Sequence, residues 1–144
     1  MIRAARSEDL DGITALYRQL HPDDPVRTDG SDRRVLDAIL ETDGLDLYVL
    51  ERDGRIVATA YLNVIPNITR SASPYAVIEN VVVDGELRGR GYGKTLMAAV
   101  LAQAWSRGCY KAMLMTGSRD PSTHGFYQSC GFSAEEKTGY IARP

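Results

Sequence analysis

Apolar residues near the start of the chain recur at helical spacing. Between residues 10 and 20 they fall every three or four positions, at Leu10, Ile13, Leu16, Tyr17 and Leu20. A second stripe with the same spacing occupies Val35, Leu36, Ile39 and Leu40. His21–Pro25, which contains two prolines and two aspartates, separates the stripes and breaks helical structure. The pattern predicts two helices, after a short strand at Ile2–Ala4.

The centre of the chain has the composition of strands. Leu45–Glu51 and Ile56–Ile65 are rich in β-prone residues, and the Asp53-Gly54 pair between them is a strong hairpin signal. Pro66–Pro74 is polar and irregular, whereas Tyr75–Val83 is the most β-prone segment of the chain. These three runs predict consecutive strands.

The last third of the chain alternates between helical and strand patterns. Apolar positions within residues 96–104 mark one face of a helix that Gly108 ends. Tyr110–Thr116 contains a continuous apolar run, which is typical of a buried strand. We expect a short helix over Ser122–Ser129.

Two final β-prone runs, Phe132–Glu136 and Thr138–Ala142, predict a closing hairpin. The element order is then βααβββαβαβ(β), which mixes hairpin and crossover connections. It predicts one α/β domain over residues 1–144, with a mixed sheet of about six or seven strands flanked by about four helices.

The stretch LRGRGYGKT, residues 87–95, lies between a predicted strand and a predicted helix, where phosphate-binding loops occur. A nucleotide P-loop has the pattern G-x-x-x-x-G-K-[ST], but its first glycine would fall on Arg88. The dinucleotide pattern G-x-G-x-x-G also fails, because its third glycine falls on Lys94 or Leu96. Neither nucleotide pattern is satisfied.

The pattern that this loop does contain is R-x-x-G-x-G, at Arg88, Gly91 and Gly93. Amide groups at the start of a helix converge on one point, and the helix dipole adds positive charge there. Glycine allows close approach of a phosphate, and Arg88, Arg90 and Lys94 add formal charge. A solvated glycine-rich turn is the alternative, but strand, loop, basic residues and helix together favour an anion site.

Composition limits the partners of such a site. The 144-residue chain has a net charge of −2, which argues against a general nucleic-acid binder. No apolar run approaches the ~18 residues of a membrane span, and the first residues lack the apolar region of a signal peptide, so we expect a cytoplasmic protein. The cysteines and histidines lack metal-ligand spacing, so we expect no metal.

Three stretches in the second half of the chain carry specific spacings. They are IENVVVDGELRGRGYGKTLM at residues 78–97, GCYKAMLM at 108–115 and FYQSCGF at 126–132. Together they resemble the GCN5-related N-acetyltransferase (GNAT) superfamily, whose motif [QR]-x-x-G-x-[GA] reads RGRGYG here and whose later FY pair precedes a GF. The resemblance implies the GNAT fold, N-acetyltransferase activity and acetyl-CoA as co-substrate.

The resemblance also implies which residues bind the co-substrate. The pyrophosphate would be held by the loop and the first helical turn: Arg88, Gly89, Arg90, Gly91, Tyr92, Gly93, Lys94 and Thr95. The pantetheine arm would pair along Val81, Val82 and Val83, beside a bulged or splayed part of the sheet. Asp120 stands where many members have an asparagine that contacts the cofactor arm.

Two titratable residues suit acetyl transfer to an amine. Glu79 is the only charge in YAVIENVVV, and burial would raise its pKa towards that of a useful base, acting directly or through a water. Tyr127 is a phenol that can protonate the leaving thiolate, a role that the family's FY pair supports. The structural alternatives are an ion pair between Glu79 and an arginine, and core packing of Tyr127. A backbone N–H near Val81 is the expected polariser of the acetyl carbonyl.

The acceptor is less clearly defined by the sequence. The motifs resemble small-amine enzymes such as aminoalkylphosphonate and glucosamine-phosphate N-acetyltransferases; the latter have aspartate where this chain has Asn80. Strict alternation would point Asn80 away from the face of Glu79, unless a bulge resets the register. We expect His21–Asp24 and Pro66–Ser73 to flank the acceptor cleft. Three tyrosines are candidates either to line that cleft or to pack in the core: Tyr17, Tyr61 and Tyr75.

Two other functions stay open at this level. A peptide or protein N-acetyltransferase needs a cleft open to an extended chain, and a non-catalytic acyl-CoA-binding module would keep the loop without the reaction. Glu79 and Tyr127 argue against the module. Dimers are common in the superfamily, so the resemblance favours a homodimer without identifying its interface. The preferred hypothesis is an enzyme that acetylates a small-molecule amine.

Overall fold

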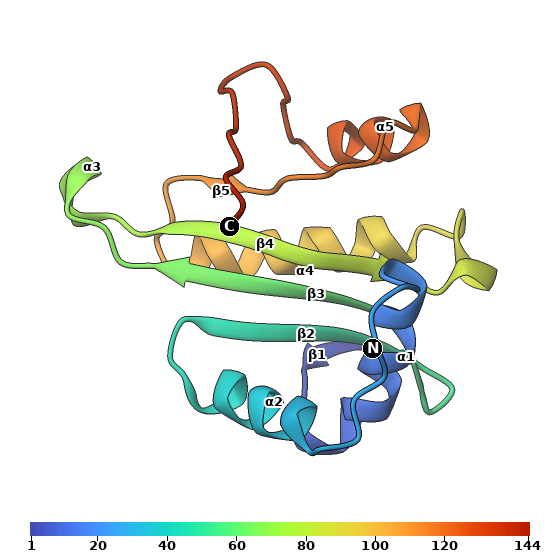
Figure 1. Cartoon of the computed structure of the whole chain (residues 1–144). Helices are drawn as coiled ribbons and strands as arrows, with labels where there is room; N and C mark the ends of the chain where they lie inside the picture. The colour runs from blue at the N-terminus through green and yellow to red at the C-terminus, as the bar shows by residue number, and fades with distance from the viewer.

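The computed structural model describes residues 1–144 and contains one mixed five-stranded sheet (Figure 1). The strands lie side by side in chain order: β1 (Ile2–Ala4), β2 (Leu45–Arg52), β3 (Arg55–Ile65), β4 (Tyr75–Val83) and β5 (Ala112–Met113). The first four pair antiparallel, and β5 pairs parallel to β4. Asp53 and Gly54 form the predicted hairpin turn, and both have positive φ, as such tight turns require.

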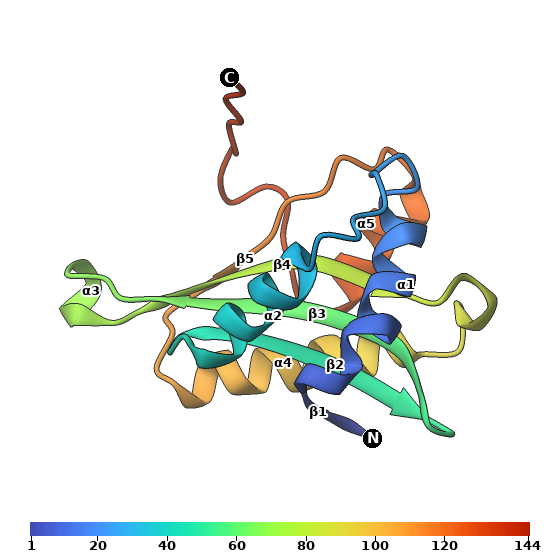
Figure 2. The same ribbon diagram turned by 60° about the horizontal axis from the view of Figure 1, so that its bottom comes forward.

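Helices cover both faces of this sheet. They are α1 (Leu10–Leu20), α2 (Ser31–Glu41), the single turn α3 (Thr69–Ala72), α4 (Tyr92–Ser106) and α5 (Pro121–Ser129). Figures 1 and 2 show α1 and α2 on one face and α4 on the other. Short 3₁₀ turns at Ser7–Asp9 and Gly85–Leu87 lead into α1 and towards α4. No helix combines the length and the apolar character needed to cross a membrane.

Alternate side chains of β3 show how the two layers are packed. Ala58, Ala60 and Leu62 are fully buried among residues of α4, in a cluster of 12 buried residues that we call the α4-side cluster. The intervening Tyr61 packs against a cluster of five buried residues under α1 and α2, which we call the α1/α2-side cluster: Ala5, Ile13, Leu36, Leu47 and Val49. The α4 face therefore holds most of the core.

The expectation of six or seven strands is wrong at the C-terminal end. The strand predicted at Tyr110–Thr116 is reduced to Ala112–Met113, and neither Phe132–Glu136 nor Thr138–Ala142 forms a strand. A strand needs a neighbour that satisfies its backbone groups, and a two-residue β5 offers no edge for a further hairpin. Up to α5 the elements follow the expected order, and the single unexpected turn α3 brings the number of helices to five.

Candidate active site

Strand β4 has a free edge over most of its length. β5 pairs with it only at Ala76 and Val77, and no strand pairs with residues 78–83 on that side. The backbone groups of Val81–Val83 therefore border an open edge, to which an extended ligand with amide groups can add like a further strand. The sequence predicts the pantetheine arm at this position.

A bulge interrupts β4 beside this edge. The pairs Tyr61–Glu79 and Thr59–Val82 leave two β4 residues opposite one residue of β3. One of these two, Asn80, has a φ of 52°, a left-handed conformation that asparagine adopts more readily than most side chains. The bulge that the family resemblance implied is therefore present.

The bulge changes which β4 side chains face each helical layer. Before it, Ile78 belongs to the α4-side cluster; after it, Val81 and Val83 pack against the same cluster. The inward positions thus switch from even to odd numbers, which sets both Glu79 and Asn80 on the α1/α2 face. Without the extra residue, alternation would separate them.

Glu79 is exposed, so the expectation that this carboxylate is buried in the strand is wrong. The side chain has no ion-pair partner, which removes the alternative of a structural pair with arginine. It lies on the same face as Tyr61, its partner in the β-ladder. Its charge also helps to raise the pKa of Tyr127, so the two predicted catalytic side chains are near each other.

The glycine loop ends in exposed amide groups at the start of α4. Gly91 caps the helix with a φ of 82°, and the first helical hydrogen bond runs from Thr95 N–H to the Gly91 carbonyl, at 3.0 Å. The amides of residues 92–94 precede that bond and have no partner within the helix. Arg88, Arg90 and Lys94 are exposed around them. These groups fit a pyrophosphate, which needs convergent N–H donors and positive charge.

The glycines of the loop serve different purposes. Gly89 and Gly91 both have positive φ, and a side chain at either would meet open space. Gly93 is buried, and a Cβ there would lie 3.1 Å from the Phe126 ring and 3.2 Å from Val83. The third glycine of the motif is therefore required for close packing of α4 against α5 and β4.

Tyr127 lies on α5 and is half buried against the α4-side cluster. Its ring packs beside Phe126 at 5.0 Å and edge-on to Phe132 at 6.1 Å. Burial first, and then the neighbouring Cys130 and Glu79, raise the pKa of the Tyr127 phenol. The hydroxyl is therefore protonated at neutral pH and can act as a donor.

Asp120 caps the helix that carries Tyr127. Its carboxylate accepts a hydrogen bond from Ser122 N–H at 2.9 Å, and Pro121 occupies the first position of α5. Hydrogen bonding from Ser122 lowers the pKa of Asp120. The structure thus gives Asp120 a capping role, and its contact with the cofactor arm stays a prediction.

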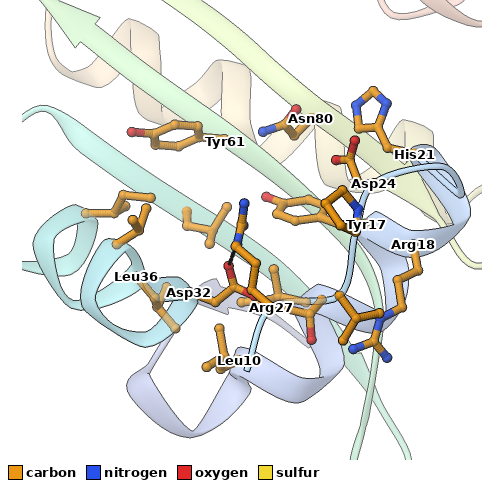
Figure 3. A pocket seen from close by; sticks show the side chains of 17 residues that line it. Leu10, Tyr17, Arg18, His21, Asp24, Arg27, Asp32, Leu36, Tyr61 and Asn80 are labelled. Atoms are coloured by element: carbon orange, nitrogen blue, oxygen red, sulfur yellow. Dashed lines mark hydrogen bonds and ion pairs between the residues drawn. The ribbon is translucent and has the colours of Figure 1, made fainter. Parts of the chain in front are cut away.

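A cavity of about 330 Å³ lies between the sheet and the α1/α2 layer (Figure 3). Its walls come from α1, α2, the loop between them, β2, β3 and the bulge: Leu10, Ile13, Thr14, Tyr17, Arg18, His21, Asp24, Pro25, Val26, Arg27, Asp32, Val35, Leu36, Ile39, Leu47, Tyr61 and Asn80. Asn80 places one end of the cavity at the bulge. A cavity of this volume suits a small molecule.

Tyr17 is the main polar group inside this cavity. Burial raises its pKa to about 12, and hydrogen bonding with Thr59 and Asn80 opposes the rise. Figure 3 shows the Tyr17 ring between Asn80 and Arg27. A protonated phenol beside the Asn80 amide gives the bulge end of the cavity both donors and acceptors.

Only one of the two loops expected at the acceptor cleft reaches the cavity. His21 and Asp24 line it, whereas no residue of Pro66–Ser73 does, because that segment lies at the far tip of the β3–β4 hairpin (Figure 1). Tyr75 is near that tip too and stacks edge-on with Tyr110 at 6.5 Å. No group of three or more His, Cys, Asp and Glu side chains is arranged to hold a metal ion.

Comparison with known protein families decides the assignment. The model described as acetyltransferase (GNAT) family matches residues 11–132, a range that includes the free edge, the bulge, the glycine loop and Tyr127. The chain belongs to this acetyltransferase family. The predicted enzyme class, an acetyl-CoA-dependent acyltransferase, is thereby confirmed, as is acetyl-CoA as the co-substrate.

Relatives of this GNAT protein include named enzymes. Glucosamine 6-phosphate N-acetyltransferase 1 of Oryza sativa subsp. japonica is 32% identical over 84% of this chain and 73% of that protein. Glucosamine 6-phosphate N-acetyltransferase of Trypanosoma brucei brucei is 39% identical, but the match spans 58% of this chain and 55% of that protein. More distant relatives, each 28% identical, are named phosphinothricin N-acetyltransferase (Alcaligenes faecalis) and aminoglycoside N(6')-acetyltransferase type 1 (Salmonella typhimurium).

A solved structure extends the comparison over the whole chain. A putative acetyltransferase from Agrobacterium tumefaciens str. C58 is 46% identical, with a TM-score of 0.95 over 100% of this chain and 99% of that chain. Similarity at this level over the whole chain supports the fold of this protein.

Sequence reasoning missed the apolar wall of the cavity. Val35 and Ile39 recur at helical spacing, which normally indicates core, yet both line the cavity. The Arg27–Asp32 ion pair was also missed, since nothing in the loop sequence fixes its geometry. The bulge had one local signal: Asn80 interrupts a run of β-branched residues, and asparagine is among the residues that accept positive φ.

Proposed function

We propose that this GNAT enzyme transfers the acetyl group of acetyl-CoA to a primary amine of a small molecule, by direct attack in a ternary complex. The observation that carries the proposal is the bulge at Asn80. It lies where the free edge of β4 meets the cavity, so one short segment, residues 79–81, borders both a thioester site and an acceptor site.

Acetyl-CoA would bind through the backbone more than through side chains. The amides of residues 92–94 and the exposed Arg88, Arg90 and Lys94 would hold the pyrophosphate. The pantetheine amides would pair along Val81–Val83, where β4 has no neighbour. Fixing both ends of the arm holds the thioester near the bulge and converts the reaction into a step between bound partners.

The reaction needs balanced proton transfers. Glu79 takes one proton from the ammonium group, directly or through a water, and the amine nitrogen then attacks the thioester carbonyl. The Val81 N–H stabilises the negative carbonyl oxygen, and the C–S bond breaks as the carbonyl re-forms. Tyr127 protonates the departing thiolate; one of the two protons still on nitrogen restores the phenol, and the other stays on the amide product. One proton leaves the site overall, through Glu79.

The exposure of Glu79 favours the route through water. An exposed carboxylate on the α1/α2 face is solvated where the amine would enter, so a water can relay the proton to it. The raised pKa of Tyr127 keeps the acid protonated.

The relatives support a small amine as the acceptor. Their names refer to glucosamine 6-phosphate, phosphinothricin and aminoglycosides, which are all small amine-bearing molecules. The cavity of about 330 Å³ agrees with an acceptor of that size.

The proposal is tested by thiol release from acetyl-CoA in the presence of a panel of primary amines. We expect release with at least one class among alkylamines, amino sugars and their phosphates, aminoalkylphosphonates, polyamines and amino acids. The N,N-dimethyl form of the best amine is the matched control and should be inert, because after attack its nitrogen has no proton to lose and no neutral amide can form. Calorimetric binding of acetyl-CoA without thiol release for any primary amine would contradict the proposal and favour a binding module or a protein acceptor.

A further inference from the structure

We infer that the acceptor is a primary amine with an uncharged, apolar body, and that this body lies along α2 in the cavity of Figure 3. The inference rests on the proposed function, since it names the substrate class of the proposed acceptor site. It distinguishes this enzyme from relatives named for a phosphorylated amino sugar.

The wall of the cavity is apolar along α1, α2 and β2. Six of its side chains there are Leu10, Ile13, Val35, Leu36, Ile39 and Leu47. Val26 and Val35 also line the cavity and leave 66% and 58% of their surface exposed. Apolar surface that neighbouring residues leave uncovered is stabilised when an apolar ligand removes it from water.

The charges of the cavity do not suit a phosphate. The Arg27 guanidinium is bound to the Asp32 carboxylate, through Nε at 2.8 Å and through a second contact from Nη2. Arg18 is exposed and extends away from Tyr61 and Asn80 (Figure 3). A phosphate is best held by several unpaired cations or by convergent amides, and Arg18 is the only lining arginine that has no ion pair.

An ammonium group suits the bulge end of the same cavity. Figure 3 shows Asn80, His21 and Asp24 on one side of the cavity and Leu10 and Leu36 on the other. Asp24 has no ion-pair partner within the chain. A primary amine would therefore point its nitrogen towards the bulge and Asp24, and its carbon chain towards α2.

Two matched amines test the inference. Hexylamine and 6-aminohexanoate share the amine and the chain length, but the second has a carboxylate at its far end. We expect kcat/KM to be at least tenfold higher for hexylamine. Within the series from propylamine to hexylamine, kcat/KM should rise about fourfold for each buried methylene. A flat or falling series, or equal use of 6-aminohexanoate, would overturn the inference.

A substitution on α2 gives an independent test. Val35→Arg adds a cation to the apolar wall at an exposed helical position, where arginine is well tolerated. It should lower kcat/KM for hexylamine and raise it for 6-aminohexanoate. Leu40→Arg is the matched control, because Leu40 is an exposed apolar residue of the same helix that does not line the cavity. Equal effects of the two variants would contradict the inference, and circular dichroism melting verifies that both fold.

A binding measurement separates this inference from the proposed function. Methyl NMR of Ile13 and Ile39, with CoA present, should show shifts on adding hexylamine and much smaller shifts with 6-aminohexanoate. Hexylamine binding without any amine turnover would support the apolar character of the cavity and refute the proposed function. Turnover of amines with no dependence on chain length would refute the inference alone. Neither binding nor turnover would refute both.

Discussion

The two faces of the sheet are packed to different densities. The α4 face holds a cluster of 12 buried residues, whereas the α1/α2 face holds five and leaves a cavity of about 330 Å³ beside them. The α4 side includes fully buried Leu96, Met97 and Val100. The α1/α2 side relies partly on polar contacts, among them Ser7 Oγ donating to Asp37 at 3.0 Å and the pairing of Arg3 with Asp9.

This difference suggests that the α4 face supports the cofactor site and that the α1/α2 face recognises the acceptor. The densely packed α4 face fixes α4 and thereby the amide groups that would hold the pyrophosphate, a task that does not depend on which amine is acetylated. The looser face carries the cavity, whose lining can vary without disturbing that support. The bulge at Asn80 joins the two, because it sends Glu79 and Asn80 to the loose face while Val81 and Val83 stay packed on the dense one.

The largest expected effect comes from breaking the polar support of the α1/α2 layer with Asp9→Asn. Asp9 is 7% exposed, and its two carboxylate oxygens accept hydrogen bonds from the Arg3 guanidinium at 2.6 and 2.8 Å. Removing one partner of a buried ion pair costs about 3–5 kcal/mol of unfolding free energy. We expect about 3 kcal/mol, the lower end, because Glu51 still pairs with Arg3. Hydrogen exchange should speed up in α1 and α2 and change little in α4.

The same variant makes a pH prediction. Hydrogen bonding from Arg3 is the main cause that lowers the pKa of Asp9 in the folded protein. A depressed folded pKa contributes stability that is present above the unfolded value of about 4 and lost as the pH falls through the folded value. The gap in unfolding free energy between wild type and Asp9→Asn should therefore narrow from pH 7 to pH 3. Asp53→Asn, which removes only an exposed pair with Arg52, should change little at either pH.

A second prediction concerns catalysis by Tyr127, which lies near Glu79. Tyr127→Phe keeps the ring packing against Phe126 and Phe132 and removes only the hydroxyl. Loss of a general acid should lower kcat about 100-fold with little change in the KM for acetyl-CoA, measured by steady-state thiol release. Normal turnover would remove Tyr127 from the acid role.

Glu79→Gln is the variant of the proposed base on the α1/α2 face, to be compared with Tyr127→Phe. It should lower kcat mostly at low pH, where less of the amine is already deprotonated and the base matters most. Tyr127→Phe, in contrast, should lower kcat across the neutral range, because the raised pKa keeps the wild-type phenol protonated there. An unchanged pH–rate profile for Glu79→Gln would exclude Glu79 as the base.

The sequence predicted the α4 face of the sheet better than the α1/α2 face. The stripes of α1, α2 and α4 and the β2–β3–β4 meander follow strong periodicity, which reports directly on local structure. The C-terminal hairpin was wrong, because β propensity does not reveal whether a neighbouring edge exists. Burial of Glu79 was wrong, because one extra residue at the bulge changed the face and surroundings of the side chain.

The candidate site shows the same limit. The glycine loop was readable, because its pattern is local and lies at a strand–helix junction. The apolar wall of the cavity was not readable, because Val35 and Ile39 have the same spacing whether they face a packed core or an open space. Whether apolar residues meet a neighbour is a property of the assembled layers, not of the periodicity of one helix.

The smallest expected effect tests how closely the dense face is packed. Gly93→Ala would place a methyl group 3.1 Å from the Phe126 ring and 3.2 Å from Val83, closer than ordinary contact. Overpacking should cost about 1–2 kcal/mol and exceed the gain in helix propensity. Gly125→Ala is the control on α5, where a methyl group meets nothing within 4 Å, and it should stabilise by about 0.5–1 kcal/mol.

Urea unfolding of the two variants measures both effects, and their opposite signs make the comparison decisive. Both substitutions replace a helical glycine with alanine, so propensity and the entropy of the unfolded chain change almost equally. The difference then reports contact with Phe126 and Val83 alone. If Gly93→Ala were as stabilising as Gly125→Ala, α4 would have room to shift, and the last glycine of the R-x-x-G-x-G pattern would have to be explained by the approach of the pyrophosphate instead of by packing.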